Sequence, residues 1–118
     1  MMYTDDLRDY CLAKPAVTEG LPFGEDTLVF KVGEKIFLLT GIGSNTFNVK
    51  CDPELAVELR EKHSEVLPGY HMNKKHWNTV QMDGGLTNKQ LHEMIDHSYD
   101  LILKSLPKKL QQEIGANA

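Results

Sequence analysis

Long hydrophobic runs are absent from this sequence of 118 residues, and apolar stretches such as 36–39 are far shorter than the roughly 20 residues that span a bilayer. We therefore predict no membrane span. The first residues carry acid where a secretory signal needs a basic start and an apolar core, so we expect a cytoplasmic protein. Repeats, low-complexity tracts and flexible linkers are also missing, which predicts a single domain over residues 1–118.

Cysteine is scarce as well. The chain has two cysteines, Cys11 and Cys51, and no CxxC pair, which excludes a disulfide-rich scaffold and argues against a structural zinc site. We expect both thiols to be reduced and buried. Cys51 has an alternative interpretation, because it precedes an expected helix start at Asp52-Pro53, where a helix N-terminus can lower the pKa of a thiol.

What the sequence does contain is ordinary globular composition with an uneven charge. Hydrophobic residues make up 41% of the chain and charged residues 25%, which excludes a disordered polymer. The net charge of -4 comes from residues 1–30, whereas acids and bases balance in the remainder. Residues 66–82 contain no acid, but they hold two lysines, two histidines and two aromatic residues. A globally acidic chain therefore has one basic, aromatic segment.

Hydrophobic periodicity predicts an α+β protein. Thr4 caps a first helix that ends before Pro15, Asp52 caps a second helix, and Thr87 caps the longest helix. Four strands and a short terminal helix complete the expected elements, at 28–32, 35–39, 47–50, 76–82 and 108–114. The order helix, three strands, helix, strand, helix predicts a small antiparallel sheet with helices packed on one face and the other face exposed.

Several stretches in this order resemble the MmcQ/YjbR family of small bacterial proteins. They are CDPELAVELREKH, PGYHMNKKHWNTV and IDHSYDLILKSLPKK, and the opening LRDYCLAKPAVTEGLPFG and the strand pair LVFKVGEKIFLL fit the same family. The likeness covers about residues 7–109. It implies a CyaY-like fold of the α+β class. Because a DNA-binding role through a "double wing" of two loop-bearing strand pairs has been proposed for the family, it also implies DNA as a partner.

The segment 70–80 is the strongest candidate for contact with DNA. Lysines can reach phosphates, and aromatic or imidazole rings can stack on bases. The proposed wings would map to the turns at 33–34 and 41–46. The predicted nucleic-acid-binding residues are Lys74, Lys75, His76, Trp77 and His71, with Lys31, Lys35 and Lys50 as the basic flanks of the wings.

Other interpretations of this segment stay open. Trp77 and Val80 could fill the core while Asn73 and Asn78 hold a loop together through hydrogen bonds. The same segment could instead serve a small ligand or a protein partner without binding nucleic acid. His71 and His76 could act at a cleft, but no nucleophile elbow, P-loop or HExxH motif completes a mechanism, so we expect binding rather than catalysis.

Metal binding is the remaining class. Asp5 and Asp9 share a face of the first helix, but acids in a first turn are explained by the helix dipole, and a hard cation needs more oxygen ligands. We therefore expect no metal and no cofactor. His97 is expected to be a hydrogen-bonded structural histidine, whose imidazole Asp96 or Asp100 could hold. A monomer is plausible, and the sequence does not name a protein partner.

Overall fold

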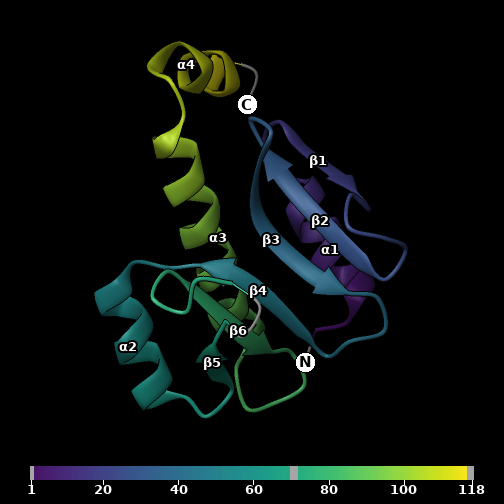
Figure 1. The fold of residues 1–118 in the computed structure, drawn as a ribbon, viewed down its shortest axis with the longest axis vertical. Helices are drawn as coiled ribbons and strands as arrows, with labels where there is room; N and C mark the ends of the chain where they lie inside the picture. Colours follow the sequence, from purple (N-terminus) through teal and green to yellow (C-terminus); the bar gives the residue numbers. More distant parts are fainter. Residues whose placement is uncertain (1, 70–71, 117–118) are drawn as a thin grey trace.

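The computed structural model describes residues 2–69 and 72–116, which form one antiparallel sheet and four helices (Figure 1). In chain order the elements are α1 (Thr4–Leu12), β1 (Val17–Gly20), β2 (Thr27–Val32), β3 (Lys35–Gly41), β4 (Thr46–Lys50), α2 (Pro53–Lys62), β5 (Val66–Pro68), β6 (Trp77–Gln81), α3 (Asn88–Ser105) and α4 (Lys108–Ala116). No helix in these ranges has the length and apolar character needed to cross a membrane.

The six strands lie in the order β1-β2-β3-β4-β6-β5, and every neighbouring pair is antiparallel. The register places Phe47 opposite Val80 and Asn48 opposite Thr79 on the two central strands. Because successive side chains in a strand point to opposite faces, these two pairs mark the two sides of the sheet. Phe47 and Val80 are fully buried, whereas Asn48 and Thr79 are half-buried.

All helix packing is on the Phe47 side of the sheet. α3 crosses β2, β3 and β4, α1 packs on β1, and α2 packs on β5. In Figure 1, α1 and part of α3 lie behind the sheet, so the viewer looks onto the side that no helix covers. We call this side the open face; it includes the side chains of Lys31, Leu39, Asn48, Lys50, Trp77, Thr79 and Gln81.

Helix starts follow the expected capping chemistry at two of three sites. Asp52 accepts a hydrogen bond from Leu55 N at 3.2 Å, with Pro53 at the first helical position. Thr87 and Gln90 form a reciprocal capping box at the start of α3. The first helix differs from the prediction, because Tyr3 rather than Thr4 is its N-cap.

The predicted fold class is confirmed, and the element order is longer than expected. The predicted order is helix, three strands, helix, strand, helix, and the observed order is α-β-β-β-β-α-β-β-α-α. The two extra strands, β1 and β5, are short and lie at the edges of the sheet, where one neighbour supplies their hydrogen bonds. Their own sequences, VTEG and VLP, have no run of alternating apolar residues to reveal them.

Candidate functional site

The acid-free segment reaches β6 through a loop, and its tryptophan lies on the open face. Trp77 is paired with Lys50 across β4 and β6, so their side chains share the open face at the same end of the sheet. Trp77 is half-buried, while Lys74 and Lys75 in the preceding loop are exposed. His71 lies outside the described residues. The interpretation that Val80 fills the core is confirmed, but Trp77 is on the opposite side of the strand.

Arg60 of α2 holds this loop in place. Its Nε donates to Asn78 Oδ1 at 2.8 Å, and its Nη2 donates to Trp77 O at 3.1 Å and to Lys74 O. Sequence reasoning missed Arg60. The available signal is its position one helical turn after Ala56, the buried residue of α2, which directs Arg60 toward the sheet.

Hydrogen bonds within the loop complete its shape. Asn73 Oδ1 accepts from Lys75 N at 3.0 Å, as the structural interpretation of the loop asparagines expects. The main chain of His76 is fixed at both ends, because its N donates to Asn73 O at 3.1 Å and its O accepts from Cys51 N at 2.7 Å. The lysine-bearing loop is therefore tied to both α2 and the end of β4.

The basic residues predicted to flank the wings lie on both sides of the sheet. Lys31 and Lys50 point to the open face. They lie near the C-terminal ends of β2 and β4, which are at the same end of the sheet. Two strand spacings separate them, or about 10 Å. Lys35 lies on the helix side, where its Nζ approaches Ser105 Oγ at 3.5 Å.

The two predicted wing turns point in opposite directions. The turn at 33–34 joins β2 to β3, and the turn at 41–46 joins β3 to β4, so the two turns lie at opposite ends of the sheet. Lys50 ends β4 at the far end from the turn at 41–46. The structure therefore groups Lys31 and Lys50 with the loop before Trp77 rather than with two separate wings.

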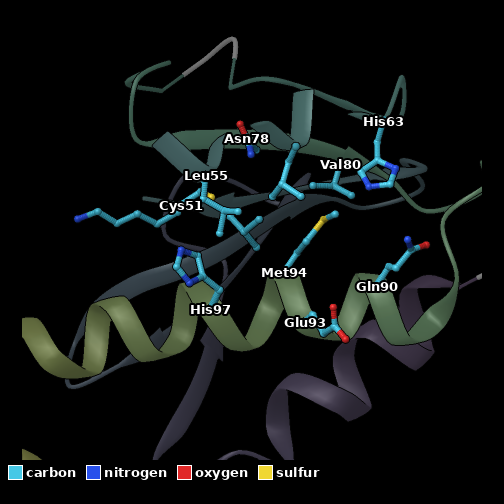
Figure 2. Close-up of a pocket in the computed structure, with 12 residues that line it drawn as sticks. Cys51, Leu55, His63, Asn78, Val80, Gln90, Glu93, Met94 and His97 are labelled. Carbon is cyan, nitrogen blue, oxygen red and sulfur yellow. The ribbon is translucent and has the colours of Figure 1, made fainter. Parts of the chain in front are cut away.

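A cleft of about 190 Å³ lies on the other side of the sheet, between α2 and α3 (Figure 2). Leu55 and Leu59 line it from α2, Met94 lines it from α3, and Val49 and Val80 form its floor. His97 Nε2 accepts a hydrogen bond from Asp52 N at 3.1 Å, which joins the two helices at one end of the cleft. His97 is therefore a hydrogen-bonded structural histidine as predicted, but its partner is Asp52 N rather than Asp96 or Asp100.

Neither cysteine is activated. Cys11 and Cys51 are free and buried. Burial raises the pKa of the Cys51 thiol to about 11 and that of Cys11 to about 12. The alternative in which the start of α2 lowers the pKa of Cys51 is therefore wrong, because desolvation, followed by the charge of Asp52, raises that pKa.

A cluster of polar and aromatic side chains connects α1 to α3. Asp96 accepts from Tyr10 Oη at 2.7 Å and also pairs with Lys14, while the rings of Tyr10 and His92 stack with centroids 3.7 Å apart. Desolvation, followed by the hydrogen bond to Asp96, raises the pKa of Tyr10. These contacts fix one helix on the other. Among the described residues, no group of three or more His, Cys, Asp or Glu side chains is arranged to hold a metal ion.

The fold and these sites define a class of small α+β proteins, in which helices cover one face of a six-stranded antiparallel sheet and leave the other face open. Residues 12–101 match the YjbR family model, and the chain belongs to the YjbR family.

Similar proteins span nearly the whole chain. The uncharacterised protein YjbR of Escherichia coli is 34% identical over 110 residues, covering 92% of this chain and 93% of that protein. The uncharacterised protein YbdF of Escherichia coli is 35% identical over 105 residues, covering 87% of this chain and 86% of that protein. The crystal structure of Deinococcus radiodurans protein DR2400 has a TM-score of 0.90 and 41% identity over 98% of this chain and 89% of its own.

Proposed function

We propose that the protein binds DNA through the open face of the sheet and the loop that leads into β6. The observation that supports this most is the distribution of charge over the strands. Glu19 is the one acidic residue in the six described strands, and it is paired with Arg8 of α1 on the helix side. The open face therefore presents lysine and uncharged side chains, with no strand carboxylate to repel a phosphate.

The arrangement at one end of this face fits a nucleic-acid strand. Lys31 and Lys50 supply two cations about 10 Å apart. The loop that leads into β6 adds the exposed Lys74 and Lys75 at the same end of the sheet. Trp77 lies directly opposite Lys50, so a base stacked on the indole ring would have its phosphate close to an ammonium group. Cations at phosphates supply affinity, and the aromatic ring adds a contact that every base can make.

Six of the seventeen acidic residues behind the overall charge of -4 lie on α1 and α2 rather than on the strands of the open face. Asp5, Asp6 and Asp9 lie on α1, which packs behind the sheet, and Glu54, Glu58 and Glu61 lie on α2. Interactions between exposed charges are screened over about 8 Å at physiological ionic strength. A strand bound at the end of the open face would therefore respond to the lysines there and also to Glu54, which lines a surface hollow together with Lys75.

The test uses Trp77, the single tryptophan of the chain, as the reporter. Titration with single-stranded and duplex DNA at low salt is expected to quench its fluorescence, and the affinity should fall as salt rises. Reversing Lys74 and Lys75 to Glu should weaken binding and lower the salt dependence by about one unit of slope for each lost contact. Affinity that does not vary with salt, or that survives this reversal, would contradict the proposal.

A further inference from the structure

The cleft between α2 and α3 is the second place where the molecule presents a shaped surface, and it is separate from the open face. α2 and α3 form its two walls, and β4 and β6 form its floor from the helix side of the sheet. Lys50 also borders it, but the register directs the Lys50 side chain to the open face. Of the residues proposed to meet DNA, only Lys50 lines this cleft, so a ligand there would not touch Trp77 or the other lysines.

The middle of the cleft is apolar. Leu55 and Leu59 lie one turn apart on α2, Val49 and Val80 lie below them, and the thioether of Met94 faces them from α3 (Figure 2). Branched aliphatic side chains remove apolar surface of a ligand from water. A methionine sulfur also makes favourable contacts with aromatic rings.

The ends of the cleft are polar. His63 and Gln90 lie together at one end, and His97 lies at the other (Figure 2). These groups can hydrogen-bond a ligand without requiring it to carry a charge. Glu93, exposed at the rim on α3, disfavours an anion. Arg60, the one arginine of α2, already donates hydrogen bonds to Asn78 and to two carbonyl groups of the segment that leads into β6.

The size of the cleft limits what can fill it. A buried apolar cavity of about 150 Å³ takes up benzene, and this cleft measures about 190 Å³. A bicyclic aromatic ring is therefore the largest rigid body expected to enter without moving α2 away from α3. Most small-molecule sites combine such an apolar body with a few polar groups that fix the orientation of the ligand.

From this geometry we propose that the cleft between α2 and α3 binds an uncharged aromatic molecule of one or two rings, with a ring nitrogen hydrogen-bonded at the end formed by His63 and Gln90. This site is independent of the proposed DNA contact, because it uses the opposite side of β4 and β6.

The experiment follows the methyl groups of the methionines by NMR in protein labelled at those methyls. Met94 lines the cleft, whereas Met82 and Met2 are buried elsewhere in the core and serve as internal controls. Titration with indole or benzimidazole is expected to move the Met94 methyl signal in a saturable manner, through the ring current of the bound ligand, while the Met82 and Met2 signals stay in place. Benzimidazole should bind more tightly than toluene, which has no ring nitrogen.

Two variants that fill the cleft and one matched control sharpen the test. Leu55→Trp fills the cleft from α2 and Glu93→Trp fills it from α3, and each should weaken benzimidazole binding about tenfold or more. Val57→Trp places the same side chain on the exposed side of α2, where Val57 is 50% exposed, and should leave binding unchanged. Because Glu93 is exposed, its variant should fold even if Leu55→Trp does not.

Three results would overturn the proposal. They are no saturable shift of Met94, equal shifts at Met94 and Met82, and unchanged affinity in Glu93→Trp. Equal affinity for toluene and benzimidazole would contradict the assigned hydrogen bond to the ring nitrogen. None of these outcomes depends on whether the open face binds DNA.

Discussion

The two sides of the sheet differ in charge, in packing and in what they offer a partner. The helix side holds the aromatic core, the ion pair between Arg8 and Glu19, and the cleft between α2 and α3. The open face has no covering helix, and its polar pairs, such as Asn48 and Thr79, hydrogen-bond to each other across the strands. The net charge of -4 therefore sums the charges of two unlike surfaces and does not describe either surface.

Neighbouring residues on β4 give the largest expected contrast between the two sides. Phe47 is fully buried against the helices, so Phe47→Ala should lower the free energy of unfolding by about 3–5 kcal/mol. Asn48→Ala changes the next residue, which points to the open face, and should cost about 0.5–1.5 kcal/mol through loss of the hydrogen bond from Thr79. Urea unfolding measures both. Equal losses would contradict the assignment of the two faces.

Arg60 connects the two sides, because it lies on α2 and holds the loop that carries Lys74. Arg60→Ala leaves the buried Asn78 amide without its partner, and should lower the free energy of unfolding by about 1–3 kcal/mol. The emission of Trp77 should also shift, because Trp77 O loses a donor. Arg8→Ala is the matched control.

Arg8 forms an exposed ion pair with Glu19, which solvent screens, so its removal should change stability much less than Arg60→Ala and should not move Trp77 emission. If Arg8→Ala and Arg60→Ala had the same effect on stability and on emission, Arg60 would not be the residue that holds the loop. Thermal or urea unfolding followed by the Trp77 signal gives both readings in one experiment.

The cysteines test how closed the helix side is. Because burial raises the pKa of the Cys51 thiol to about 11, almost none of it is thiolate at pH 8, and a thiol reagent should react with the folded protein far more slowly than with the unfolded chain. Rapid modification of Cys51 in the folded protein, measured by mass spectrometry, would show that the cleft opens.

The raised pKa of the Cys51 thiol also makes the stability of the protein depend on pH. In the unfolded chain the thiol loses its proton near its ordinary pKa of about 8.5, whereas the folded protein keeps that proton until higher pH. The unfolded state therefore binds fewer protons above that value, and stability should fall as pH rises from about 9 toward 11. Replacing Cys51 with Ala should remove part of this decline in urea unfolding measured across that range.

The parts of the fold that follow from local sequence were predictable. The Asp52-Pro53 start of α2, the Thr87 and Gln90 capping box and the hairpin around Gly33 all depend on residues a few positions apart. β1 and β5 were not predictable in this way, because pairing with a neighbouring strand, rather than their own pattern, makes them strands.

The candidate sites also combine features that local sequence predicts with features that depend on tertiary structure. The acid-free segment and its lysines are visible in the sequence, but their grouping with Lys50, and the separation of Lys35, depend on strand register. The contacts of Arg60 with Asn78 and of His97 with Asp52 N join residues 18 and 45 positions apart. The cleft exists only because α2 packs beside α3, which no local pattern encodes.

Charge reversal on the open face should have the smallest effect on folding. It is also the most direct test of the proposal that this face binds DNA. Lys31→Glu with Lys50→Glu should leave the unfolding midpoint nearly unchanged, and should lower the slope of log affinity for DNA against log salt by about two units. Lys108→Glu with Lys109→Glu makes the same change in net charge on α4, which packs on α3. The first pair should weaken DNA binding and lower its salt slope, whereas the second pair should leave both unchanged; equal weakening by both pairs would contradict binding at the open face.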